Sequence, residues 1–359
     1  MVVSGTCLDL LLPAIIMLAT LTPAVTAATT YKVTPNGKWT SSSGYSSSSK
    51  IYSLPGALAI AKAGDTILLA DGTYTDRLES YRDGKSSSPI KIKGGEGAKI
   101  KAGSPSVHIR HSWILLQGFT VDGKHESSSK KSSYVNKCVS VEGTGKSSSD
   151  PLKGFVMKDM VIKNCGTECV RLKNFVTNAE IKDNTITKCG VYDFKFDEGG
   201  DNGEGIYIGT SSTQWKNGED RCNDNRISGN TISTYGSECV DVKEGCSGTT
   251  IEENKCSDQR QALTGCFSVR GDDNTVRYNT AKDCEGVGVR LGGAKVGKHQ
   301  YGKDNDVYEN TITDAEMGFM RITAMPQGRI CENKCKGGSC DITADIGVRD
   351  IRETWDEDC

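Results

Sequence analysis

The sequence predicts an all-β chain folded as a right-handed parallel β-helix, a solenoid in which short strands stack coil upon coil. Three observations lead to this prediction. A short strand closed by asparagine recurs at intervals close to one coil, a second strand family recurs between these repeats, and the intervening segments lack helical periodicity. In such a solenoid each coil buries its apolar face only by stacking on the next coil.

A short helix is expected at the start of the solenoid. The apolar residues between Leu54 and Ala61 have helical spacing, and this pattern stops at Gly64. The apolar run from Thr66 to Ala70 is typical of a strand. We therefore expect the helix to cap the first coil and shield its strand edges. Further short strands are expected at residues 90–93, 99–102 and 113–121.

The asparagine repeat defines the coil. The steps between successive asparagines are 46, 24, 25, 31 and 23 residues. We interpret the step of 46 as two coils of 23, and the step of 31 as one coil with a surface insertion. Asn tolerates left-handed backbone and can bond to the same amide one coil away, which favours a structural ladder over a catalytic role. The repeated residues are Asn184, Asn230, Asn254, Asn279, Asn310 and Asn333.

The second strand family shares a six-residue pattern that we align without gaps. Its third and fifth positions are mostly apolar and point inward, so the fourth and sixth positions point outward. Coils stack about 4.8 Å apart, so the sixth position forms a column of cations in which Gly209 is a gap. The strands begin at Lys137, Glu168, Glu204, Glu238, Gly265, Glu285 and Glu316. The predicted cation column is Lys173, Lys243, Arg270, Arg290 and Arg321, and beside it lie Arg171, Tyr207, Asp241 and Ser268.

A column of like charges destabilises a sheet unless anions neutralise it. An acidic polysaccharide is therefore the expected ligand. In an alternative interpretation, the glutamates that begin the strands form ion pairs with the cations, and the pairs make up a structural ion ladder. The same carboxylates could bind Ca²⁺, whose ligands are oxygens, and Glu204 and Glu238 are the expected ones. An acidic loop nearby contains Asp193, Asp197, Glu198 and Asp201.

The N-terminus and the cysteines predict secretion. An apolar core from Leu10 to Leu21 is followed by the small residues before a signal-peptidase site, so we expect residues 1–27 to be a signal peptide and residues 28–359 to be the β-helix domain. Fourteen of the fifteen cysteines lie in the latter, an even number that predicts up to seven disulfides in an extracellular protein. A formal net charge of −2 argues against a nucleic-acid partner. We expect a monomer without a membrane partner.

Residues 54–74, together with the Asn-Thr-Ile coils that follow, resemble the pectate-lyase-like superfamily of parallel β-helix proteins, over most of residues 50–340. That superfamily includes lyases, hydrolases, epimerases and proteins without catalytic activity, so the resemblance implies the fold more than the reaction. Residues 237–245 and 267–290 resemble the chondroitinase B and alginate lyase family. This second resemblance implies a Lys base on one coil, an assisting Arg one coil on, and nearby acidic residues that hold Ca²⁺.

Two alignments to that family stay open. One makes Lys243 the base and Arg270 its partner, whereas the other places Arg270 and Arg290 at the Lys and Arg positions. In β-elimination a base removes the proton beside a uronate carboxylate while a cation neutralises that carboxylate.

The sequence therefore predicts a carbohydrate-active protein, a polysaccharide lyase acting on an anionic uronate polymer. The alternative is a non-catalytic extracellular β-helix that binds polysaccharide; a uronate epimerase or a glycoside hydrolase is a third reading. The expected catalytic residues are Lys243, Arg270 and Arg290, the expected substrate-binding residues are Lys173, Tyr207, Asp241 and Arg321, and the expected Ca²⁺ ligands are Glu204 and Glu238.

Overall fold

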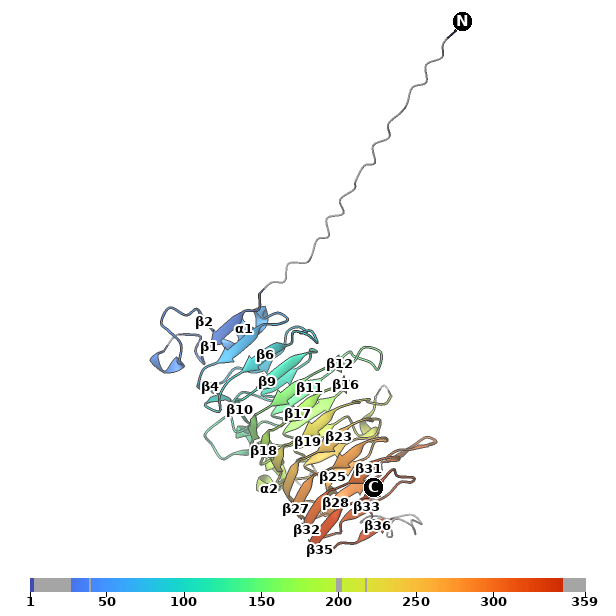
Figure 1. The fold of residues 1–359 in the computed structure, drawn as a ribbon. Coiled ribbons are helices and arrows are strands. Elements are labelled where there is room, and N and C mark those ends of the chain that lie inside the picture. The colour runs from blue at the N-terminus through green and yellow to red at the C-terminus, as the bar shows by residue number, and fades with distance from the viewer. Residues whose placement is uncertain (3–26, 39, 198–201, 217, 345–359) are drawn as a thin grey trace.

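The computed structural model describes residues 1–2, 27–38, 40–197, 202–216 and 218–344. In these residues three long parallel sheets run along one stack of coils, from the blue end to the red end of Figure 1. Each coil adds one strand to sheet A, then one to sheet B and one to sheet C, and strands of consecutive coils pair in parallel. The predicted right-handed parallel β-helix is confirmed.

The strands are short, and their bounds are as follows. Sheet A contains β2 (Ile51–Tyr52), β1 (Thr30–Val33), β3 (Thr66–Leu69), β6 (Ile90–Lys93), β9 (Ile114–Gln117), β13 (Val156–Lys158), β17 (Glu180–Lys182), β20 (Arg226–Ser228), β23 (Thr250–Glu252), β26 (Thr275–Arg277), β31 (Asp306–Tyr308) and β34 (Ile330–Cys331). Sheet B contains β4 (Gly72–Tyr74), β7 (Ala98–Ile100), β10 (Thr120–Asp122), β14 (Val161–Lys163), β18 (Thr185–Thr187), β21 (Thr231–Ser233), β24 (Lys255–Gln259), β27 (Thr280–Cys284), β32 (Thr311–Ala315) and β35 (Lys334–Gly338). Sheet C contains β5 (Leu78–Glu79), β8 (Val107–Ile109), β11 (Val139–Glu142), β15 (Val170–Lys173), β19 (Ile206–Ile208), β22 (Val240–Val242), β25 (Gly265–Val269), β28 (Val287–Leu291), β33 (Met320–Ile322) and β36 (Ile342–Ala344).

Alternating apolar side chains fill the interior of the stack. Ile206 and Ile208 of β19 and Val240 and Val242 of β22 are fully buried, each stacked on its counterpart one coil away. Burying one such side chain contributes about 1.5–3 kcal/mol. The intervening residues point outward, as the six-residue pattern predicted.

The predicted capping helix is α1 (Leu54–Ile60), at the blue end of the stack (Figure 1). The side chain of Ser53 caps it by accepting a hydrogen bond from the Gly56 N–H. Leu54 and Leu58 are buried in the core cluster of the first coils. The helix therefore covers an end of the stack that would otherwise leave strand edges open.

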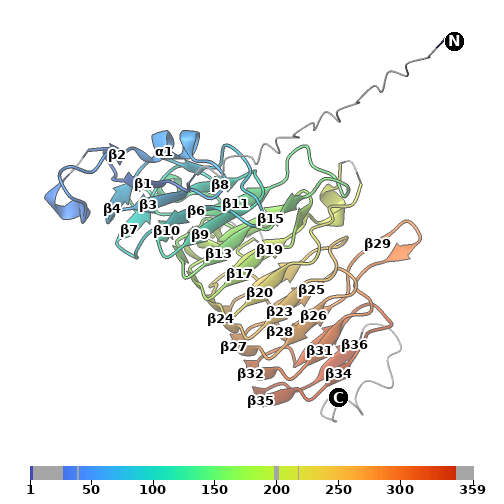
Figure 2. The same cartoon turned by 45° about the horizontal axis from the view of Figure 1, so that its top comes forward.

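Several insertions interrupt the coils in the described residues, and two of them lie beside β19 and β28 of sheet C. The first holds α2 (Val191–Phe196) before β19 and a 3₁₀ turn, η3 (Ser212–Gln214), after it. The second is a hairpin of β29 (Lys295–Val296) and β30 (His299–Gln300), which projects from the side of the stack (Figure 2). The remaining short elements are η1 (Ser41–Ser43), η2 (Lys131–Ser133), β12 (Leu152–Lys153) and β16 (Val176–Thr177).

The asparagine ladder is confirmed. Each Asn side chain donates from Nδ2 to Oδ1 of the next Asn at 2.8–3.0 Å, from Asn184 through to Asn333. The interpretation of the 46-residue step as two coils was wrong, because Asn184 bonds directly to Asn230 and β17 pairs directly with β20. The extra length lies in the segments that contain α2 and η3. One coil therefore has the length that was expected for two.

Replacing one ladder residue should destabilise the fold. In Asn254→Ala we expect the free energy of unfolding to fall by about 2–3 kcal/mol, because the Asn254 amide donates to Ile227 O and Asn279 Oδ1 and accepts from Asn230. Urea denaturation measures this loss. Lys255→Ala alters the exposed neighbouring residue and should change the value by less than about 0.5 kcal/mol. Equal effects of the two substitutions would remove the ladder as a source of stability.

Disulfides are present as predicted, although fewer than the maximum of seven that the cysteine count allowed. Four of them join the start of a sheet C strand to the sheet B region of the next coil, and so tie consecutive coils together. Cys222 and Cys246 are buried free thiols in contact with each other. The five disulfides with both partners in the described residues are Cys138–Cys165, Cys169–Cys189, Cys239–Cys256, Cys266–Cys284 and Cys335–Cys340.

The predicted signal peptide falls almost wholly on residues 3–26, which lie outside the described residues. Within the described part of the chain, no helix has the length and apolar character needed to cross a membrane.

Candidate active site

The predicted site residues lie on the outward face of sheet C, but two strands are shifted in register. Ser268 pairs with Arg290, and Arg290 pairs with Arg321. Both arginines therefore lie in the fourth-position column and not beside Lys243 and Arg270. The prediction of one cation column was wrong here because apolar alternation has a period of two, so a shift of two residues keeps every side chain on its face. The observed columns are Arg171, Tyr207, Asp241, Ser268, Arg290 and Arg321, and beside them Lys173, Gly209, Lys243 and Arg270.

Three predicted residues stack in the middle of this face. The guanidinium of Arg171 lies 3.5 Å from the ring centroid of Tyr207, and Lys243 Nζ lies 4.4 Å from it. All three are at most 7% exposed. Burial raises the pKa of Tyr207 to about 12, although the two cations act in the opposite direction. The Tyr207 hydroxyl forms no hydrogen bond with a described residue and is not fully buried, so it remains accessible to a ligand.

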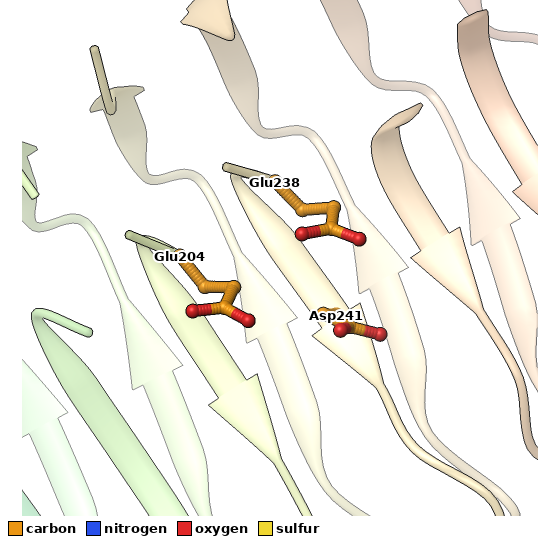
Figure 3. A group of neighbouring side chains, drawn as sticks. All are labelled: Glu204, Glu238 and Asp241. Carbon is orange, nitrogen blue, oxygen red and sulfur yellow. The ribbon is translucent and has the colours of Figure 1, made fainter. Parts of the chain in front are cut away.

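Three carboxylates gather beside this stack (Figure 3). Glu204, Glu238 and Asp241 are buried, and one oxygen of each lies within 4.8 Å of the others. Burial, reinforced by repulsion between the carboxylates, raises the pKa of Glu204 to about 8 and also raises the pKa of Glu238. The structure thus brings the two predicted metal ligands together and adds Asp241, which we had placed with the substrate.

This cluster suits a hard divalent cation. Ca²⁺ takes about six to eight oxygen ligands, largely from carboxylates, and a cation between these three groups would offset their repulsion. Lys243 Nζ contacts Asp241 and supplies a single positive charge, and Asp241 Oδ1 has no hydrogen-bond partner. Asp193 of the predicted acidic loop accepts a hydrogen bond from the Asn202 N–H, outside the cluster. Glu198 and Asp201 of that loop lie outside the described residues.

Most cations on the face have a carboxylate partner, so the alternative of a structural ion ladder holds in part. Among the described residues, Glu168 pairs with the column cation Arg171 from the first strand position. Its bonds to Lys137 and Arg171 lower the pKa of Glu168 to about 2 despite burial. The ion pairs on the face include Lys173 with Glu142, Arg171 with Glu168, Lys243 with Asp241, and Arg270 with Glu244.

Arg290 is the exception. It forms no hydrogen bond or ion pair with any described residue, and its Nε is buried. Burial and the neighbouring Arg270 lower the pKa of Arg290. An unpaired, partly buried cation is costly, and a bound anion would remove that cost.

Glu244 is a site residue that sequence reasoning missed. It is fully buried, and its Oε1 lies 2.7 Å from Arg270 Nη2 and accepts a hydrogen bond from the Ala294 N–H. Its Oε2 accepts from the Ser212 N–H. One carboxylate thus orients Arg270 and joins both insertions to the face. The signal available in the sequence was an acidic residue directly after Lys243.

A groove of about 850 Å³ lies at the end of β11 and β15. Arg171 and Lys173 line it, and the loops at residues 143–147 and 210–220 form its walls. Trp215 lines it as well and is held by a hydrogen bond from Nε1 to Thr210 O. Of the predicted substrate-binding residues, Lys173 therefore borders a groove large enough for sugar units, with an aromatic ring in its wall.

The ion pairs at the edge of this face make stability depend on pH. A hydrogen bond with His108 and the nearby Lys173 lower the pKa of Glu142 from 4.5 to about 2. A carboxyl with a lowered pKa in the folded state stabilises the fold above its ordinary pKa and ceases to do so as the pH falls through 2. We expect the free energy of unfolding of the wild type to exceed that of Glu142→Gln by about 1–2 kcal/mol near neutral pH. This difference should shrink between pH 4.5 and 2. Urea denaturation at several pH values measures this, and a constant difference would contradict it.

Solved structures of similar fold include two polysaccharide lyases. The alginate lyase from Paenibacillus sp. str. FPU-7 is 21% identical over 81% of this chain and 96% of its own, with a TM-score of 0.61. Pectate lyase Pel9A is 13% identical over 90% and 80%, with a TM-score of 0.60. DFA-IIIase from Arthrobacter chlorophenolicus A6 is 12% identical over 84% and 81%, with a TM-score of 0.52. No curated protein matches the chain. At these identities the likeness shows the fold.

The family described as "Periplasmic copper-binding protein (NosD)" matches residues 116–357. Copper favours imidazole and sulfur ligands, whereas the group of three potential ligands on the sheet C face consists of carboxylates. The donor set of the sheet C face therefore does not fit copper. With a match over two thirds of its length, the chain belongs to the NosD family of parallel β-helix proteins.

Proposed function

We propose that the protein is a secreted polysaccharide lyase that cleaves an anionic, uronate-containing polymer on the outward face of sheet C. The observation that best supports this proposal is Arg290, a cation on the face that forms no ion pair with a described carboxylate. Arg270 is 23% exposed and lies on the adjacent strand. Together the two arginines would bind the carboxylate of a uronate and stabilise the negative charge that grows on it during proton removal.

The proton transfers fall to Tyr207 and Lys243. Asp241 holds Lys243 as an ammonium ion, so we assign Lys243 the donor role and Tyr207 the acceptor role, in place of the Lys243 base that the family resemblance implied. Tyr207 takes the proton from C5 of the uronate, and the electron pair forms the C4=C5 double bond. The bond from C4 to the glycosidic oxygen breaks, and that oxygen takes a proton from Lys243. Arg171 and Lys243 beside the ring favour its ionised form.

Ca²⁺ is the proposed metal, with Glu204, Glu238 and Asp241 as its ligands. When bound, it would supply positive charge beside the substrate carboxylate. We expect Ca²⁺ at a hundred times its Kd to stabilise the fold by about 2.7 kcal/mol, seen as a rise in Tm. Glu238→Gln should abolish the rise, and Cu²⁺ should not produce it. A Tm that ignores Ca²⁺ would contradict the site.

The proposed function also includes secretion of the protein. We propose that residues 1–27 are removed as a signal peptide and that residues 28–359 work outside the cytoplasm as a monomer. The disulfides support this, because disulfides form and persist in oxidising compartments.

Incubation with alginate, pectate, chondroitin sulfate and dermatan sulfate tests the function. A lyase creates a double bond conjugated to the carboxylate, whose ultraviolet absorbance grows with time. Growth on one polymer is the expected result. A flat trace on all four with retained binding to one would indicate a non-catalytic polysaccharide-binding protein, and neither cleavage nor binding would refute the proposal.

A further inference from the structure

An exposed aromatic pair lies at the opposite end of the sheet C face from the groove with Trp215. Phe194 of α2 is 45% exposed and Tyr235 is 37% exposed, and their ring centroids are 5.9 Å apart. α2 is fixed to the stack, since Tyr192 Oη donates to Tyr134 O at 2.8 Å. The pair is therefore a fixed apolar surface in contact with water.

This pair lines a cavity of about 240 Å³ whose wall includes Ser237, the residue before Glu238 of the carboxylate cluster. The Ser237 hydroxyl lies within hydrogen-bond distance of the side chains of Glu238 and Gln261. The cavity thus borders the start of β22, whereas the groove with Trp215 borders the other end of the neighbouring strands. From Ser237 to Lys243 the chain extends about 20 Å, at roughly 3.3 Å per residue.

We propose that this cavity, which we call the aromatic subsite, binds a sugar residue of the polysaccharide beyond the cleaved bond. The inference rests on the proposed function and adds that the substrate lies along the strands, from the aromatic subsite to the groove. The apolar C–H face of a sugar ring packs on Phe194 and Tyr235, while its hydroxyl groups bond to Gln261 and the exposed Asp197. Arg260 attracts the sugar carboxylate, since its ion pairs are long, at 3.4–3.5 Å.

Affinity electrophoresis in gels that contain alginate, pectate, chondroitin sulfate or dermatan sulfate tests the subsite without a need for catalysis. The variant Phe194→Ala/Tyr235→Ala should weaken retardation by about tenfold in apparent Kd. Both side chains are exposed, so its Tm should remain close to that of the wild type. Phe194→Tyr/Tyr235→Phe keeps the aromatic rings and should retain wild-type binding.

A matched control is available on another face. Tyr278 is 43% exposed, has the same positive φ as Tyr235 within a degree, and packs against Tyr308 at 5.9 Å between centroids. Tyr278→Ala should bind as the wild type does. Equal retardation of the wild type and the double alanine variant would overturn the subsite alone. Absence of wild-type retardation on all four polymers would overturn the proposed function, and the subsite with it.

Discussion

Tyr207→Phe is expected to lower kcat by about 10²–10⁴-fold while the fold keeps its stability. The substitution removes only the hydroxyl, which has no hydrogen-bond partner among the described residues, so folding loses nothing. The ring remains to pack against Arg171 and Lys243. Removal of this one oxygen should therefore lower the activity without changing the stability of the fold.

Initial rates of double-bond formation and the free energy of unfolding together measure this effect. Tyr278→Phe removes a hydroxyl on a remote turn and should leave the rate unchanged. Because burial opposes ionisation of Tyr207, the wild-type reaction should also become faster as the pH rises above neutral. A Tyr207→Phe variant as active as the wild type would remove this residue from the proton transfers.

Glu244→Gln is expected to lower the free energy of unfolding by about 3–5 kcal/mol. Each oxygen of Glu244 accepts a backbone N–H, from Ala294 or from Ser212, so the amide group of Gln must face a donor. The substitution also leaves Arg270 without its partner. We therefore expect a raised KM in addition, because Arg270 loses its orientation and both insertions loosen.

Urea denaturation measures the loss, and Glu180→Gln serves as its control. Glu180 also pairs with cations, Lys182 at 3.1 Å and Arg226 at 3.7 Å, but it is 30% exposed on sheet A. Exposed pairs contribute about 0–1 kcal/mol. If both substitutions lower the free energy of unfolding by the same amount, Glu244 does not stabilise the contacts between sheet C and the two insertions.

The sequence contained enough to predict the coil, because three of the five steps between the ladder asparagines are 23–25 residues long and each ladder amide bonds to the next. It could not give the length of every coil. Between Asn184 and Asn230 the chain is twice the usual length, and only the pairing of β17 with β20 shows one coil with an insertion.

Register was predictable only to within two residues. Inward and outward positions alternate with a period of two, so the pattern placed Arg290 and Arg321 on the correct face but in the wrong column. Contacts across insertions were beyond prediction. Glu244 meets Ser212 and Ala294 because two loops fold back onto sheet C, and no local pattern in the sequence encodes that return.

The most direct test of the central claim is to carry out the cleavage in ¹⁸O-labelled water and weigh the products. Elimination breaks the chain without water, so a lyase on sheet C predicts unsaturated products with no ¹⁸O at the new ends, provided that the reducing ends are reduced at once, before their anomeric oxygen exchanges with water; the wild type should form these products and Tyr207→Phe should not. Incorporation of one ¹⁸O for each bond cleaved would mean hydrolysis, and would contradict the assignment of this face to β-elimination.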